Sequence, residues 1–157
     1  MPHRALAQDA YHQALLNQFE TDFGVSGGTF VLSATETSTL SRAFYPGSVQ
    51  RQVITVTGQP FSRIVRLNVP VRGNNPWDAF IGFSLAQNVN VGDRGVLVFW
   101  ARGLSAERGY GITNANIEKN GPPWTKLLTS GAIPSSEWQQ WVIPFEATTD
   151  HLASETQ

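Results

Sequence analysis

The sequence predicts an all-β protein, an antiparallel sandwich that carries a short helix or tail at its N-terminus. Short apolar runs with period-two alternation recur from about residue 50 to residue 145, and turn residues separate them every ten or so positions. All five tryptophans lie between Trp77 and Trp141, each in or beside such a run. About seven or eight short strands with this spacing are typical of an antiparallel sandwich.

The N-terminal region predicts one short helix. Between Gln8 and about Phe23 the apolar residues recur at roughly helical spacing, namely Ala10, Ala14, Leu15 and Phe19. After Gly24 the pattern changes to short β-prone runs. We therefore expect residues 1–24 to form a tail with this helix, and residues 25–157 to form one β domain.

The β domain is divided into strands by its turn residues. Gly92-Asp93-Arg94-Gly95 predicts a hairpin turn, and the run from Gly95 to Arg102 that follows is apolar on both faces. Because such a run must be covered on both sides, we expect it at the centre of a sheet. The predicted strands cover residues 29–33, 52–57, 64–71, 79–85, 95–102, 110–118 and 138–145.

Composition limits the classes of function. A chain of 157 residues that is 41% hydrophobic supports a single core. Its net charge of −1 gives no electrostatic reason to expect nucleic acid or an anionic membrane as a partner. The chain has no cysteine, which excludes a disulfide framework and a thiolate metal site. No apolar run approaches the length of a transmembrane helix.

An ordered set of aromatic and turn segments extends from Asn75 to Phe145. The set consists of Asn75-Pro76-Trp77-Asp78, Gly92-Asp93, Phe99-Trp100-Ala101-Arg102, Gly121-Pro122-Pro123-Trp124-Thr125, and the stretch from Trp138 to Ile143-Pro144-Phe145. Over roughly residues 50 to 150, its order and spacing resemble the β-sandwich carbohydrate-binding modules attached to bacterial family 10 xylanases and related β-glycanases. The resemblance implies a jelly-roll sandwich of the galactose-binding type, without catalysis.

Aromatic rings presented beside polar groups are the expected sugar-binding residues, because sugars stack their C–H faces on such rings. Trp77 and Trp124 lie at turns where loops meet a sheet edge, and their alternative role is to plug the ends of the sandwich. Trp100 and Trp141 are expected in the core, and Trp138 is undecided. The candidate carbohydrate-binding residues are Trp77, Trp124, Tyr110, Arg72, Asn114, Asn116 and Glu118.

The polar candidates each have a second interpretation. Asn114, Asn116 and Glu118 share one face of a predicted strand, which is either the floor of a shallow groove or a solvated surface. Arg72 and Arg102 either bind sugar hydroxyls or pair with Asp78 or Glu118. The resemblance also allows one structural Ca²⁺, for which Glu20 and Asp22 are the candidate ligands.

No catalytic motif is visible. The sequence contains neither G-x-S-x-G nor H-E-x-x-H nor a P-loop, and His3, His12 and His151 all lie near the termini. We therefore expect no enzyme activity and no cofactor. Two functions stay open. One is a module that directs a linked glycoside hydrolase to xylan or β-glucan. The other is a structural accessory domain of such an enzyme that binds no sugar.

The two ends of the sequence carry expectations of their own. Ala5-Leu6-Ala7 matches the end of a secretory signal peptide or arises by chance, and together with the resemblance it predicts a secreted, extracellular bacterial protein. The resemblance also implies one or two further strands after Phe145. We therefore expect that the chain is truncated or that another chain supplies the missing strand, since an open edge invites pairing.

Overall fold

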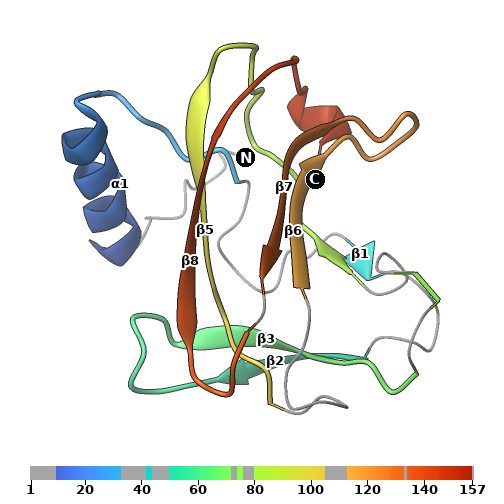
Figure 1. Cartoon of the computed structure of the whole chain (residues 1–157). Helices are drawn as coiled ribbons and strands as arrows, with labels where there is room; N and C mark the ends of the chain where they lie inside the picture. The colour runs from blue at the N-terminus through green and yellow to red at the C-terminus, as the bar shows by residue number, and fades with distance from the viewer. Residues whose placement is uncertain are drawn as a thin grey trace, which may run out of the picture.

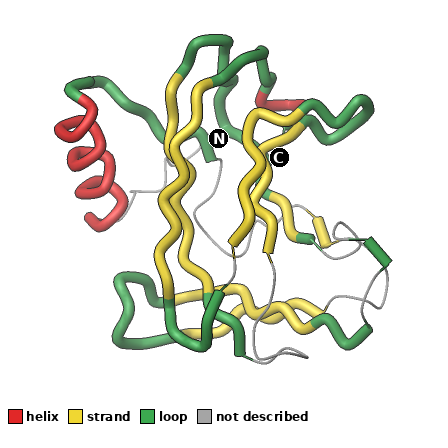
Figure 2. Tube along the Cα trace, in the orientation of Figure 1, coloured by secondary structure: helices red, strands yellow, loops and turns green. Residues whose placement is uncertain are grey.

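The computed structural model describes residues 10–32, 42–43, 50–71, 74–75, 80–104, 113–132 and 134–156. Strands make up most of the regular secondary structure in this part of the chain, and one short α-helix precedes them (Figure 2). The elements are α1 (Ala10–Phe23), β1 (Arg42–Ala43), β2 (Gln50–Thr55), β3 (Arg63–Asn68), β4 (Ile81–Gly82), β5 (Arg94–Ala101), β6 (Thr113–Glu118), β7 (Lys126–Ala132), β8 (Gln139–Glu146) and the 3₁₀-helix η3 (Ala153–Glu155).

The strands pair as antiparallel ladders, β1 with β4, β2 with β3, β5 with β8, and β6 with β7. Figure 1 shows the β5–β8 and β6–β7 ladders standing roughly upright, with the β2–β3 ladder crossing near their lower ends. The prediction of an antiparallel, β-rich protein with one short N-terminal helix is therefore confirmed.

Helix α1 ends in a Schellman motif. The N–H of Val25 donates to the carbonyl of Glu20 at 2.9 Å, and the N–H of Gly24 donates to the carbonyl of Thr21 at 3.3 Å. Gly24 has φ 62°, a left-handed conformation that glycine adopts without steric cost. None of the residues of α1 is buried. No helix in the described ranges combines the length and apolar character needed to cross a bilayer.

The hydrophobic core lies between the β6–β7 ladder and the segment that precedes β5. Leu85, Val89, Ile117 and Ala147 are its buried residues. Partly buried side chains pack against them, among them Leu127 and Leu128 of β7 and Phe145 of β8. The core therefore joins elements that are far apart in the sequence.

Strand β5 is covered on both faces, but within the described residues it pairs only with β8. The expected position at the centre of a sheet is therefore not found. Phe99 stacks on its cross-strand partner Trp141 at 6.2 Å, on the same face as Phe145, which packs on the core. Trp100 and its partner Gln140 lie on the opposite, outer face. Aromatic side chains from outside the ladder, such as Phe61, cover that outer face. This cover, and not a second neighbouring strand, explains why β5 is apolar on both faces.

Strands β1 and β7 were not among the predicted strands. The sequence of β7, Lys-Leu-Leu-Thr-Ser-Gly-Ala, has two adjacent leucines and a glycine and lacks period-two alternation. Its pairing with β6 decides its conformation, with a register shift between Ile117 and Glu118. Tertiary context therefore outweighs local propensity here.

The segment after β8 runs back along the loop that precedes β5. His151 forms an antiparallel bridge with Val89, and Thr156 forms one with Lys119. The N–H of Gly92 also donates to the carbonyl of Ala147 at 2.8 Å. The described residues after β8 form these bridges and the helix η3.

Candidate functional site

Four of the candidate carbohydrate-binding residues lie in the described part of the chain, and they belong to β6 or to the turn that follows it. These are Trp124, Asn114, Asn116 and Glu118. The other three, Trp77, Tyr110 and Arg72, lie outside the described residues, as does Asp78.

One face of the β6–β7 ladder is polar and exposed. Asn114 and Asn116 of β6 point to this side, and Asn116 lies directly opposite Thr129 of β7. Ile117, the residue after Asn116, points to the other side and is buried in the core. The core thus fixes the orientation of the ladder, and the two asparagine amides are left to solvent. We call Asn114, Asn116 and Thr129 the polar face.

Glu118 lies at the end of the polar face and is already paired. The ammonium group of Lys126 donates a hydrogen bond to Glu118 Oε2 across the register shift between the two strands. Both side chains remain partly exposed. Arg102 lies instead over the ring of Trp138, with its guanidinium carbon 4.9 Å from the ring centroid. The pairing of Arg102 with Glu118, one of the two interpretations, is therefore not seen.

Trp124 occupies the turn that joins β6 to β7. Its side chain is 50% exposed, and its backbone has φ 57°, in the left-handed region that disfavours bulky residues. Its N–H donates to the carbonyl of Gly121 at 2.8 Å, and the carbonyl of the next residue, Thr125, accepts from the N–H of Lys119 at 2.9 Å. The turn is therefore closed by backbone bonds and places an exposed indole beyond the end of the polar face.

A second aromatic group lies on the outer face of the β5–β8 ladder. The ring of Phe61 meets Trp100 at 5.8 Å and Trp138 at 5.1 Å, both edge to face. Arg102 covers Trp138, as described above. We call Phe61, Trp100, Trp138 and Arg102 the outer aromatic cluster. The three tryptophans in or beside this ladder are partly buried, namely Trp100, Trp138 and Trp141.

The outer aromatic cluster was not predicted as a site. Period-two alternation does place Trp100 and Arg102 on one side of their strand. The contact with Phe61, however, comes from a segment about 40 residues away, and no local pattern encodes a contact of that separation.

The proposed calcium ligands have other partners. Glu20 Oε1 accepts a hydrogen bond from the N–H of Gly28 at 2.7 Å, and Asp22 Oδ1 accepts one from Gln18 Nε2 at 2.7 Å. Within the described ranges, no group of three or more histidine and acidic side chains is placed to hold a metal ion. The position of Glu20 is explained by its contact with the loop after α1.

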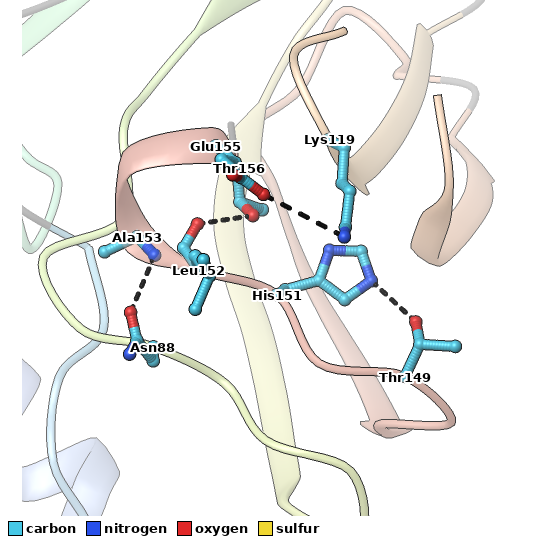
Figure 3. Close-up of polar contacts among 8 residues, drawn as sticks. All are labelled: Asn88, Lys119, Thr149, His151, Leu152, Ala153, Glu155 and Thr156. Carbon is cyan, nitrogen blue, oxygen red and sulfur yellow. Dashed lines mark hydrogen bonds and ion pairs between the residues drawn. The ribbon is translucent and has the colours of Figure 1, made fainter. Parts of the chain in front are cut away.

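His151 is the fully buried histidine of the C-terminal segment, with 0% of its surface exposed. Figure 3 shows its ring beside Thr149. Its Nε2 lies 3.2 Å from the hydroxyl of Thr149, whereas its Nδ1 is buried without a hydrogen-bond partner in the described structure. Burial lowers the pKa of His151, the nearby Lys119 ammonium lowers it further, and Asp150 opposes both. Because the imidazole is inaccessible to solvent, the contact between His151 and Thr149 helps to attach the C-terminal segment to the core.

No family model, no curated protein and no solved structure matches this chain. Its function must be inferred from these surfaces.

Proposed function

We propose that the chain is a non-catalytic carbohydrate-binding module that directs a linked glycoside hydrolase to plant cell-wall β-glycan, either xylan or β-glucan. The observation that carries the proposal is Trp124, an exposed indole that a closed turn holds in a left-handed backbone conformation. In this proposal the fold is a jelly-roll sandwich of the galactose-binding type. The protein acts outside the cell, where its ligand is.

The strain at Trp124 supports a role in binding. A left-handed conformation costs a non-glycine residue about 1 kcal/mol, and glycine would remove that cost. A bulky apolar side chain that is also half exposed contributes little to the core in return. Strained backbone of this kind concentrates at binding sites, so the indole is best explained by what it contacts outside the chain.

The polar face supplies the groups that such a ligand needs. Each asparagine amide of Asn114 and Asn116 offers two donors and an acceptor, and Thr129 offers a hydroxyl. A saccharide stacked on Trp124 could direct its hydroxyls to these groups, because the turn with Trp124 follows β6 directly. Binding would raise the effective concentration of a linked enzyme at its substrate, without bond chemistry of its own.

A structural accessory domain is the second candidate, and exposed apolar residues favour it. Leu67, Val69 and Val71 alternate along the end of β3 and the residues after it, and their side chains are 39%, 44% and 64% exposed. An apolar strip of this kind is suited to packing against another domain. In that role the chain would hold a catalytic domain in place and bind no sugar.

Native affinity electrophoresis separates the two candidates. The folded protein is run in gels with and without soluble xylan, β-glucan or mannan. We expect selective retardation in the xylan or β-glucan gel and its loss in Trp124→Ala. The matched control is Phe23→Ala, because Phe23 is an exposed aromatic residue, 60% accessible, at the end of α1 and outside the proposed site. Equal mobility of the folded protein in every gel would instead favour the accessory domain.

A further inference from the structure

Within the described part of the chain, helix α1 packs against the rest of the molecule through half-buried side chains. It contains no buried residue, although it is 14 residues long and lies beside the β5–β8 ladder (Figure 1). Its half-buried residues, Tyr11, His12, Leu15, Leu16, Phe19 and Glu20, recur on one side at a spacing of three to four positions. A helix that buries so little apolar surface gains little free energy from packing.

The hydroxyl group of Tyr11 provides a polar attachment of α1 to the ladder. Tyr11 Oη accepts a hydrogen bond from Trp100 Nε1 at 2.9 Å and another from Gln140 Nε2 at 2.7 Å. Trp100 and Gln140 are directly opposite each other in the register of β5 and β8. Two side-chain donors of the outer face thus converge on a single oxygen atom.

The surroundings of that oxygen are those of a site for a hydroxylated ring. Phe61 packs edge to face against Trp100, and Trp138 packs against the same Phe61 ring, so aromatic side chains surround the indole that donates to this oxygen. Arg102 adds a further donor, because its Nε is buried and has no hydrogen-bond partner in the described part of the chain. Aromatic surface combined with convergent donors binds ligands that present an apolar face and hydroxyl oxygens at their rim.

We propose that the outer aromatic cluster, together with Gln140, is a second saccharide-binding face that α1 covers, and that the Tyr11 hydroxyl occupies the position of a ligand hydroxyl. This inference rests on the proposed function, because it takes the same ligand class for the second face. It assigns to α1 the role of a cover that competes with the ligand.

The segment after α1 determines what must change for the helix to detach. Gly24 and Gly27 both have left-handed conformations, with φ 62° and φ 78°, and a Cβ atom at either position would meet no atom within 4 Å. The loop also holds α1 at Gly28, whose N–H donates to Glu20 Oε1 at 2.7 Å, so detachment of α1 requires that this bond break or that the chain turn at the two glycines. The second face is open only in the fraction of molecules in which α1 has detached, and its apparent affinity is reduced by that fraction.

The first part of the test measures attachment without any ligand. Tyr11→Phe keeps the ring and removes the oxygen that accepts both hydrogen bonds. Amide hydrogen exchange in residues 12–23 should become faster by about fivefold or more, since one net hydrogen bond is worth about that factor in an equilibrium constant. Exchange in β5 and β8 should not change. The matched control is Thr21→Val, which removes a hydroxyl that bonds only within the helix, to the carbonyl of Asn17. Unchanged exchange in Tyr11→Phe would overturn the inference.

The second part measures binding in the same affinity gels. We expect Tyr11→Phe to be retarded more than the unmodified protein, and Tyr11→Phe/Gln140→Ala to lose that gain. If Tyr11→Phe speeds amide exchange in α1 but is not retarded more than the unsubstituted protein, the proposal of a second saccharide-binding face is overturned. That result would leave the proposed function standing if the unmodified protein is still retarded through Trp124. If Tyr11→Phe is retarded more than the unsubstituted protein and Trp124→Ala is retarded as much as the unsubstituted protein, the second face is supported and the site at Trp124 is overturned. No retardation of any variant would overturn both.

Discussion

The main chains of His151 and Val89 exchange two hydrogen bonds, one from His151 N to Val89 O at 2.7 Å and one from Val89 N to His151 O at 2.9 Å. Val89 is a core residue, and the imidazole of His151 is completely buried beside it. The C-terminal segment is therefore attached to the core at a position where burial disfavours the charged form of a histidine. Figure 3 shows Lys119, which approaches this histidine, also reaching Glu155, and the ion-pair distance is 4.0 Å.

We expect this attachment to weaken in mild acid. Burial holds the pKa of His151 below its ordinary value of about 6.5, so between these two pKa values the unfolded chain binds a proton that the folded protein excludes. Stability is complete above about pH 6.5 and falls as the pH falls toward the folded pKa, by at most about 1.4 kcal/mol per pH unit. The measurement is the free energy of urea unfolding between about pH 5.5 and pH 7.5.

The variant His151→Gln tests the source of that slope. It keeps a side chain that can hydrogen-bond Thr149 and removes the titrating group, so the slope should flatten. The control is His12→Gln on α1, in which the slope should persist. A slope that survives unchanged in His151→Gln would mean that other groups cause it.

Replacement of Trp124 by glycine should separate binding from stability. The backbone of Trp124 is left-handed, so Trp124→Gly relieves a cost of about 1 kcal/mol that Trp124→Ala retains. Glycine also gains freedom in the unfolded chain, which offsets part of this benefit. We therefore expect Trp124→Gly to be at least as stable as Trp124→Ala in urea, with both variants losing retardation in glycan gels. A clearly less stable glycine variant would show that the turn does not hold this conformation.

The close approach of Gly95 and Phe145 gives a test of the β5–β8 register. The two residues are directly opposite, and a Cβ atom at Gly95 would overlap the ring of Phe145. Gly95→Ala should cost about 1–3 kcal/mol in the free energy of unfolding, because the ring must move against the core. Gly131→Ala on β7 is the control, since a Cβ atom there meets nothing within 4 Å, and it should be close to neutral. Equal costs at both positions would contradict this register.

Truncation of the core residue Ile117 should strongly reduce the free energy of unfolding. Its side chain is 7% exposed and contacts the other buried residues of the core. Ile117→Ala should reduce the free energy of unfolding by about 2–4 kcal/mol. Val91→Ala, at a valine that is 63% exposed, should change it by less than about 0.5 kcal/mol. A small effect at Ile117 would place the core elsewhere.

The regular parts of this fold could be predicted from the sequence. Period-two alternation at Val65, Leu67 and their neighbours predicted β3, and helical spacing predicted α1, because both patterns report which face of one element is apolar. The strand β7 could not be predicted in this way. Its conformation is imposed by pairing with β6 and not by its own side chains.

The candidate site was predictable only in part. Residue type and the neighbouring prolines were sufficient to single out Trp124, and alternation was sufficient to place Asn114 and Asn116 on one face. The left-handed backbone of Trp124 had no signal in the sequence, since no glycine or asparagine marks that position. The contacts of Tyr11 with Trp100 and Gln140 join positions far apart in the chain, which only the folded structure brings together.

The order of the strands has a consequence for how the chain folds. The β5–β8 ladder joins Ala101 to Gln139 at one end and Arg94 to Glu146 at the other, and the whole β6–β7 hairpin lies between these strands in sequence. Closing such a long loop costs entropy, and a hairpin formed beforehand shortens the flexible chain that must be closed. We therefore expect β6 and β7 to pair early. Substitutions in that hairpin should then slow folding, whereas those in the contacts of His151 should mainly speed unfolding.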